Sequence, residues 1–173
     1  NADALMNQPD FRANERAFQL MTQVAGRSGR RTEQGLVMIQ TYMPKHPVVQ
    51  EVTKHDFQNF FNRELFERKQ FKFPPFVRLI FLEIKHKDLE TAIKASHDIV
   101  YKIKDKLGKR VSEPITPSIS KINNLFIRQI YIKLERNADL VSKTKLLLIE
   151  IKSKLAVTEG FKTVKIKIDV DPY

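Results

Sequence analysis

The sequence predicts two successive parts of different class, an α/β segment followed by an α+β domain. Two adjacent prolines, Pro74 and Pro75, stand where the preceding helical pattern ends, and proline cannot continue a helix. The charge changes at the same place, because residues 1–70 hold ten basic and eight acidic side chains whereas residues 71–173 hold twenty-one and twelve. Helical patterns dominate before the prolines, and strand patterns alternate with helices after them. The expected parts are residues 1–72 and 73–173.

The first part is expected to hold one buried strand among several helices. Apolar residues at helical spacing predict an amphipathic helix that begins near Asn14 and stops at Gly26. The apolar, β-branched run from Leu36 to Tyr42 predicts a buried strand. Asp56 is a suitable cap for a later helix. The apolar side of the first helix is expected to be Ala17, Leu20, Met21 and Val24, and on the later helix Phe57, Phe60, Phe61 and Leu65 are expected to share a face.

A single strand among helices makes an incomplete α/β layer. The opening segment from Asn1 to Leu5 contains no initiator Met. We therefore expect the chain to begin inside a larger fold, and the first part to leave an apolar surface that further strands would cover.

The second part alternates strands with two long helices. The helix from Leu89 to Leu107 has one continuous apolar face, and Gly108 supplies its stop. A second helix is expected from Leu140 to Leu155. The expected strands are Val77 to Lys85, a weaker segment from Pro114 to Ser120, Phe126 to Leu134, and Val164 to Val170. The resulting order, β-α-β-β-α-β, predicts a ferredoxin-like fold.

Alternation along the strands predicts a basic open face on this sheet. Ile130, Ile132 and Leu134 are expected to face the helices, so the residues between them should point the other way. A tyrosine among lysines can stack a nucleic-acid base while the ammonium groups hold phosphates. The alternative is a solvated face whose lysines discourage association between sheet edges. The expected nucleic-acid-binding residues, beside Gln129, are Tyr131, Lys133, Lys165 and Lys167.

The segment most informative about chemistry is QVAGRSGR, which runs from Gln23 to Arg30. Arg27 and Arg30 each follow a glycine, a pattern that lets guanidinium groups approach phosphate oxygens without obstruction from the backbone. An arginine beside a transferring phosphoryl group stabilises the charge of the transition state. The alternative is a basic turn at a helix C-terminus, where arginine is favourable in any case.

This segment resembles a helicase motif. The pattern Q-x-x-G-R-x-G-R is similar to motif VI of superfamily 2 helicases, with Ser28 where the related family has Ala. The longer string NADALMNQPDFRANERAFQLMTQVAGRSGR resembles the primosomal protein N′ family of replication-restart DNA helicases. Further similarity lies in GLVMIQTYMPKHPVVQ, RELFERKQFKFPPFVRL and the terminal IDVDP, whereas residues 86–160 match only in pattern.

The resemblance implies that the chain is the C-terminal fragment of a bacterial ATP-dependent 3′ to 5′ DNA helicase. Such a helicase binds stalled replication forks, assembles a primosome and works in the cytoplasm. Residues 1–72 would end the second RecA-like lobe, with motif VI. Arg27 and Arg30 would be catalytic, and the residues on the ATP side would be Gln23, Gly26 and Gly29.

The resemblance also implies cofactors and partners for the full-length protein. ATP and Mg would be bound there, and zinc would be bound only in a cysteine-rich insertion outside these residues. Since the sequence contains no P-loop, the fragment alone is expected to be inactive. The implied partners are forked or single-stranded DNA, the tail of the single-strand binding protein and other primosome proteins. No residue of this sequence is assigned to the tail.

The composition of the sequence favours some partners and excludes some kinds of site. The net charge of +11 points to a polyanionic partner. There is no run of about eighteen apolar residues, so no membrane span is expected. The absence of cysteine excludes disulfides and thiolate metal sites within the sequence. Two alternatives stay open: an RNA helicase, since motif VI is shared across superfamily 2, and a non-enzymatic RNA-binding or ribosomal-type basic module.

Overall fold

The computed structural model describes residues 1–28 and 36–172, and the chain divides into two compact units. Unit 1 is Asn1–Phe71 and unit 2 is Lys72–Tyr173. The apolar clusters of the two units share no residue. Each unit therefore has its own core.

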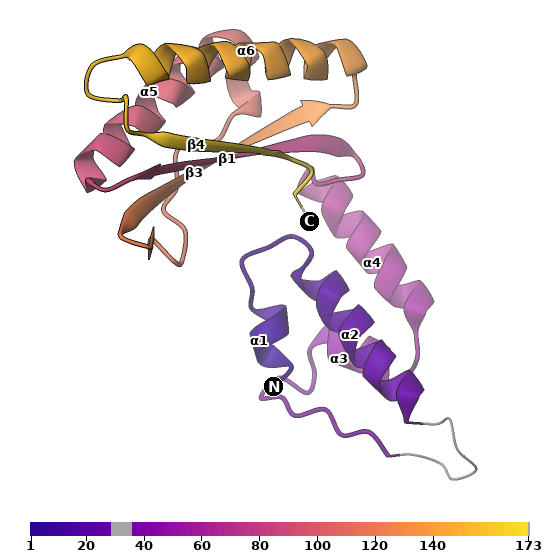
Figure 1. Ribbon diagram of the computed structural model, residues 1–173. Coiled ribbons are helices and arrows are strands. Elements are labelled where there is room, and N and C mark those ends of the chain that lie inside the picture. The colour runs from indigo at the N-terminus through magenta and orange to yellow at the C-terminus, as the bar shows by residue number, and fades with distance from the viewer. Residues whose placement is uncertain (29–35, 173) are drawn as a thin grey trace. The chain divides into compact units, whose positions relative to one another are not determined.

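The regular elements in the described part of unit 1 are helices. Its helices are α1 (Asp3–Met6), α2 (Ala13–Arg27), α3 (Pro47–Thr53) and α4 (Phe57–Gln70) (Figure 1). The expected cap at Asp56 is confirmed, because its carboxylate accepts a hydrogen bond from the Asn59 amide at 3.0 Å. Helix α3 begins directly at Pro47, where the missing amide proton of proline costs nothing.

The core of unit 1 selects a different face of α2 from the one we expected. Ala17 and Met21 are buried as expected, but Leu20 and Val24 are exposed. Phe18 is buried in their place and stacks on Phe60, with ring centroids 4.0 Å apart. The buried face is thus rotated around the helix toward Phe18 from the expected one, because α2 packs against Phe60 of α4. In α4, of the aromatic residues expected to share a face, Phe60 is buried whereas Phe57 and Phe61 are exposed.

The strand predicted from Leu36 to Tyr42 is wrong. Leu36, Met38 and Tyr42 are 84%, 87% and 89% exposed, and the segment pairs with no strand among the described residues. Its backbone bonds instead to the N-terminal residues: the Ala2 amide donates to the Gln40 carbonyl at 3.0 Å. Ile39 packs against the apolar cluster. The segment is therefore anchored along one side only.

Asp3 holds the end of this segment. Its carboxylate accepts hydrogen bonds from the Thr41 hydroxyl and from the Tyr42 amide, the latter at 3.0 Å. These two donors lower the pKa of Asp3, the hydroxyl having the larger effect. The carboxylate of Asp3 thus accepts a backbone hydrogen bond that a neighbouring strand would have accepted in the expected sheet.

Unit 2 is an α+β domain with a four-stranded antiparallel sheet. Its elements are β1 (Val77–His86), α5 (Leu89–Leu107), the 3₁₀ turn η1 (Gly108–Arg110), β2 (Lys121–Ile122), β3 (Leu125–Glu135), α6 (Ala138–Val157) and β4 (Lys165–Val170). The expected strand from Pro114 to Ser120 is wrong, because this segment meets the sheet through an isolated bridge of Ile115 with Gln129. The hairpin strand β2 follows it and is short.

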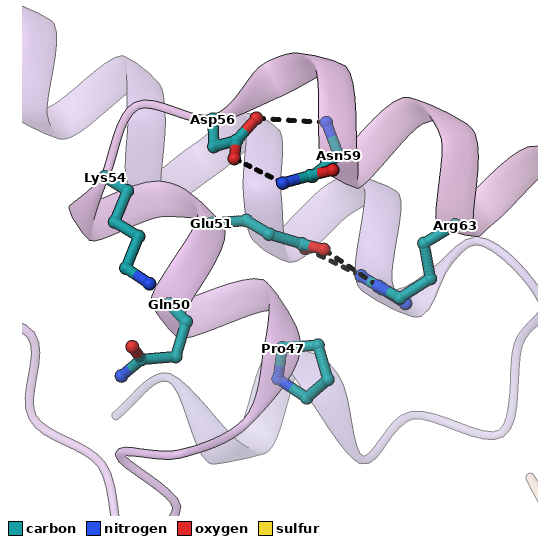
Figure 2. A pocket seen from close by; sticks show the side chains of 7 residues that line it. All are labelled: Pro47, Gln50, Glu51, Lys54, Asp56, Asn59 and Arg63. Atoms are coloured by element: carbon teal, nitrogen blue, oxygen red, sulfur yellow. Dashed lines mark hydrogen bonds and ion pairs between the residues drawn. The ribbon is translucent and has the colours of Figure 1, made fainter.

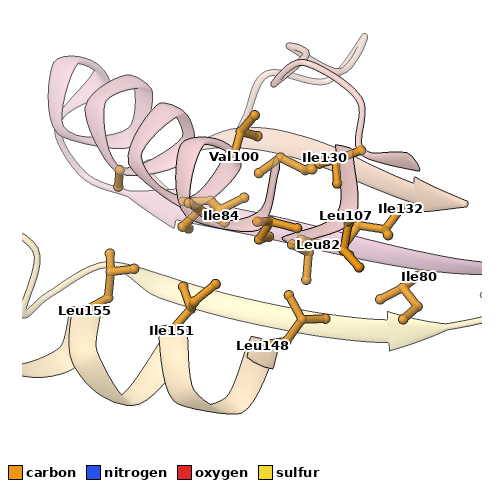
Figure 3. Close-up of a cluster of buried hydrophobic side chains, with 14 of the residues drawn as sticks. Ile80, Leu82, Ile84, Val100, Leu107, Ile130, Ile132, Leu148, Ile151 and Leu155 are labelled. Carbon is orange, nitrogen blue, oxygen red and sulfur yellow. The ribbon is translucent and has the colours of Figure 1, made fainter. Parts of the chain in front are cut away.

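Both long helices of unit 2 cover one face of the sheet, whose strand order is β2-β3-β1-β4 (Figure 1). Ile130, Ile132 and Leu134 are fully buried beneath the helices, as the alternation predicts. The core joins strand residues such as Leu82 to residues of both helices, among them Leu148 (Figure 3). The opposite face of the sheet carries no helix of unit 2.

Two tight turns limit these elements. Gly108 ends α5 with φ of 56°, a conformation that glycine adopts without steric cost. Asn123 and Asn124, which join β2 to β3, both lie in the left-handed region with φ of 50° and 60°. Asparagine tolerates that region better than most residues, and two such residues form a type I′ hairpin turn.

None of the helices in residues 1–28 and 36–172 has both the length and the apolar character needed to cross a membrane.

Candidate nucleotide and nucleic-acid sites

The arginine segment begins on the last two turns of α2. Gln23, Gly26 and Arg27 are exposed there, and Ser28 caps the helix. Helix α2 therefore extends one residue beyond the expected stop at Gly26, and the first glycine-arginine pair is helical. Gly29 and Arg30 lie outside the described residues. An exposed Arg27 in a last helical turn suits both a phosphate contact and the helix dipole.

Gly26 has no structural need to be glycine within unit 1. Apart from its chain neighbours and the backbone of its own helix, no atom of the described residues lies within 4 Å of a Cβ placed at this position, and the residue lies in a regular helix. Gly26→Ala should therefore stabilise unit 1 by about 0.5–1 kcal/mol, the difference in helix propensity. Thermal unfolding of the 173-residue chain checks this. Gly108→Ala is the matched control and should destabilise unit 2, since Gly108 has a positive φ. A loss of stability in Gly26→Ala would contradict the expectation.

A shallow pocket of about 320 Å³ lies between α3 and α4 (Figure 2). Arg63 of α4 makes a two-pronged ion pair with Glu51 of α3, at 2.9 Å from Nε and 2.8 Å from Nη2. Glu51 is the main reason that the pKa of Arg63 is raised. The lining residues are Pro47, Gln50, Glu51, Lys54, Asp56, Asn59 and Arg63.

The same arginine lies beside a second buried acid. Arg63 Nη1 is 3.3 Å from Glu64, whose pKa is raised, mainly because burial disfavours the charged carboxylate. Sequence reasoning missed this cluster, since Glu51 and Arg63 are twelve residues apart on separate helices and no motif joins them. Because its charges satisfy one another, we interpret the cluster as a clamp between α3 and α4.

The open face of the sheet brings the predicted nucleic-acid residues together. Tyr131 on β3 pairs with Phe81 on β1, which pairs with Asp169 on β4. In the same way Glu83 of β1 stands between Gln129 and Lys167. The expected residues therefore lie on one face, away from the helices; they are Gln129, Tyr131, Lys133, Lys165 and Lys167.

Aromatic neighbours shape this face. The Tyr131 ring lies 5.2 Å from the Phe81 ring at 45°, and Lys133 Nζ lies 3.9 Å from the centroid of Phe73. Partial burial lowers the pKa of Lys133, and the charge of Lys72 lowers it further. Sequence reasoning missed both phenylalanines. The alternation along β1 could have identified Phe81, whereas the place of Phe73 follows from the chain path before β1.

Part of the charge on this face is neutralised. Lys167 Nζ lies 3.4 Å from Asp169, and Lys85 Nζ lies 2.8 Å from Glu83. Strand residues of the open face include four lysines, namely Lys85, Lys133, Lys165 and Lys167, against Glu83, Glu135 and Asp169. By contrast α5, η1 and α6 together hold ten basic and five acidic residues. The larger positive surplus therefore belongs to the helical layer.

The described fold defines unit 2 as a basic α+β domain with one open sheet face. The family model that matches is described as the primosomal protein N C-terminal domain, and the match covers residues 69–173. The chain therefore belongs to this family.

Relatives extend the similarity to unit 1. The chain is 32% identical to the replication restart protein PriA of Bacillus subtilis over 175 residues, which cover 100% of the chain and 21% of that protein. It is 34% identical to the protein of the same name from Chlamydia pneumoniae, over 99% of the chain and 22% of the relative. With the Treponema pallidum protein of that name it shares 47% identity over 56% of the chain and 15% of the relative. The chain thus spans at most about a fifth of the length of these curated relatives.

Proposed function

We propose that this chain is the C-terminal part of an ATP-dependent 3′ to 5′ DNA helicase that recognises stalled replication forks and restarts replication by primosome assembly. One observation carries the proposal: a chain of this family has a motif VI-like segment that starts on the last two turns of α2. The curated relatives named above are called replication restart proteins. The proposed location is the cytoplasm.

In this proposal unit 1 ends the second RecA-like lobe and unit 2 is ferredoxin-like. The first assignment is supported by an exposed apolar set in unit 1 that further strands of a lobe would cover; the set is Leu20, Val24, Leu36, Met38 and Tyr42. The second is supported by the β-α-β-β-α-β order and by the antiparallel strand order β2-β3-β1-β4.

The proposed chemistry needs more than this chain. Arg27 and Arg30 would stabilise the charge of the transferring phosphoryl group, and the residues beside the nucleotide would be Gln23, Gly26 and Gly29. ATP with Mg would be bound mainly by the rest of the full-length protein, and any zinc by its cysteine-rich insertion. The test compares DNA-stimulated ATP hydrolysis by the intact protein and by residues 1–173. We expect turnover in the first and none in the second, and an intact protein without DNA-stimulated turnover would overturn the helicase proposal.

DNA binding is assigned to the open face of the sheet. Tyr131 presents a ring on the central strand β3, with Lys133 on the same strand, and Lys165 and Lys167 lie on β4, across β1. This arrangement suits forked or single-stranded DNA, where an unpaired base can stack while phosphates meet the lysines. The tail of the single-strand binding protein and other primosome proteins complete the proposed partners.

Tyr131→Ala should weaken binding of fork DNA by about 1–3 kcal/mol, the usual value of one stacked base, with little change in salt dependence. Lys133→Ala and Lys167→Ala should instead each reduce the slope of log affinity against log salt by about 0.7–0.9, one phosphate contact. Fluorescence anisotropy of the 173-residue chain with fork DNA at several salt concentrations measures both quantities.

The control is Tyr101→Ala, because Tyr101 is an exposed tyrosine on α5, in the helical layer. It should leave the affinity unchanged. If Tyr101→Ala weakens the affinity for fork DNA and the three open-face variants do not, the DNA binds to the helical layer.

A non-enzymatic RNA-binding or ribosomal-type module remains the second candidate. The observation that favours it is the basic surplus on the helical layer, which a polyanion of either kind would meet. Competition between fork DNA and a structured RNA of equal length separates the two. A clear preference for RNA, together with no ATP turnover in the intact protein, would favour the module.

A further inference from the structure

Helix α6 is apolar on two opposite faces. Its inner face packs on the sheet through Leu148, Ile151 and Leu155. On its outer side Leu146, Ile149 and Val157 are 66%, 58% and 75% exposed. A helix that covers a sheet normally presents a polar outer face, so apolar residues on both sides indicate a second contact.

The outer residues follow the spacing of helix-on-helix packing. Five exposed positions recur at intervals of four and three, and these are Ser142, Leu146, Ile149, Ser153 and Ala156. Such alternation places them along one seam, as at the a and d positions of a coiled coil. We call this set the α6 seam. Its two large residues lie at the centre, and the small residues at its ends allow a second helix to approach closely.

The two flanks of the α6 seam differ in charge. On one flank Lys143 pairs with Asp139 at 2.7 Å, and Lys154 pairs with Glu150 at 2.6 Å, so these charges are neutralised locally. On the other flank stand Lys145 and Lys152, two helical turns apart. Within residues 1–28 and 36–172 neither of these two lysines forms an ion pair.

We propose that the α6 seam is the docking site for one amphipathic helix of a partner protein, with acidic side chains placed opposite Lys145 and Lys152. Leu146 and Ile149 supply the apolar contact, and the two lysines determine which side of the partner helix carries acids. Charges beside an apolar seam select partner and orientation in this way in coiled coils. The proposal does not depend on the helicase function.

Charge and area disfavour other occupants. Residues 71–173 carry twenty-one basic and twelve acidic residues, so a second copy would bring like charge to the contact. A seam with two central apolar residues is also small beside the roughly 1,600 Å² of a standard stable interface. Nucleic acid needs cations but no apolar seam. On α6, Lys143 and Lys154 are already paired with Asp139 and Glu150, which leaves few cations beside the seam for phosphates or anionic lipid.

The test uses a synthetic helical peptide with leucines at heptad spacing and glutamates on the flank that faces Lys145 and Lys152. Fluorescence anisotropy measures its binding to the 173-residue chain and to the intact protein. We expect Leu146→Ser with Ile149→Ser to abolish binding, and Lys145→Glu with Lys152→Glu to weaken it about tenfold or more. A second peptide with lysines in place of the glutamates should bind this charge-reversed variant and restore the affinity. Circular dichroism should be unchanged, since all four side chains are exposed.

The matched control reverses two exposed lysines of α5, Lys94→Glu with Lys106→Glu, which changes the net charge equally. It should leave peptide binding intact. If both double variants weaken peptide binding equally, the effect comes from the net charge of the chain and the proposal is overturned. Failure of the intact protein to bind the peptide would also overturn the proposal, because it would mean that another part of the same polypeptide covers the seam. Dimerisation of the chain, or binding to phosphatidylglycerol vesicles, that is lost on Leu146→Ser would assign the seam to a second copy or to lipid instead.

Discussion

Arg27→Ala should lower the DNA-stimulated ATP turnover of the intact protein by about a hundredfold or more, with little effect on its folding. In the proposed role the guanidinium stabilises charge that develops only in the transition state, so its removal acts on turnover rather than on ATP affinity. The side chain is exposed at the end of α2, so no packing is lost with it. Steady-state hydrolysis at saturating DNA and ATP measures the effect. Arg30→Ala should behave in the same way.

Arg16→Ala is the matched control, since Arg16 is another arginine of α2 and pairs with Asp10 near the start of that helix. It should retain normal turnover. Arg27→Lys keeps the charge but loses the planar fork of donors, and we expect it to rescue turnover only in part. Near-normal turnover in both Arg27→Ala and Arg30→Ala would instead mean that the segment is a basic turn that stabilises the helix end.

Arg63→Met should destabilise unit 1 by about 2–4 kcal/mol, because it removes the shared partner of two buried carboxylates. Glu51 would lose both of its short contacts with Arg63. Glu64 would keep Arg68, at 3.7 Å, and its side-chain hydrogen bond with Asn14. Removing one member of a buried ion pair costs more than the pair itself contributes, since the remaining charge stays away from water. Urea unfolding followed by NMR signals of unit 1 measures the loss, with signals of unit 2 as the internal reference.

The loss of stability caused by Arg63→Met should be smaller at low pH. Burial raises the folded-state pKa of Glu64 above its ordinary value of 4.5, and without Arg63 that pKa rises further. The favourable contribution of a group with a raised pKa is full below its unfolded-state pKa and disappears as the pH rises through its folded-state pKa. The variant should therefore regain part of its stability as the pH falls toward 4.5. Lys54→Met removes a cation from the rim of the same pocket and is the control. A difference in the free energy of unfolding between Arg63→Met and the natural protein that does not change with pH would contradict this account.

Sequence patterns predict the elements of unit 2 well, because each element has a local signal. Helix α5 begins after a capping Asp88 and ends at Gly108, as the apolar period and the glycine indicate. Strand β3 alternates so regularly that the burial of Ile132 and its neighbours follows from sequence. The short strand β2 has no such signal, since two residues cannot show a period.

Unit 1 was harder to predict, because tertiary contacts decide between similar local patterns. An apolar run such as the one from Leu36 to Tyr42 indicates a strand only if another strand lies beside it, and no described residue supplies one. On α2, Leu20 and Phe18 are both apolar, and the stack of Phe18 on Phe60 determines which of them is buried. That contact joins residues forty-two positions apart, so the spacing of apolar residues within α2 does not reveal it.

The candidate sites also contain residues that the local sequence pattern predicts and contacts that it does not. Strand alternation was enough to place Tyr131 and Lys133 on the open face, but not to show that Phe81 and Phe73 lie against them. Those contacts depend on the strand register and on the chain path before β1. The clamp of Glu51 with Arg63 depends on the packing of two helices and was not predicted at all.

The turn between β2 and β3 restricts where the length of this domain can vary. Asn123 and Asn124 both occupy the left-handed region, and two residues are the whole length of a type I′ connection. One inserted or deleted residue there would require another turn type and would shift Lys121 and Ile122 to opposite sides of the sheet. The segment before β2 meets the sheet through isolated bridges at Val111 and Ile115 and through single hydrogen bonds, such as that from the Ile127 amide to the Ser120 carbonyl. It can therefore lose or gain residues without disturbing a ladder. Length differences among proteins of this fold should therefore accumulate between Val111 and Ser120, and the turn itself should keep its two residues.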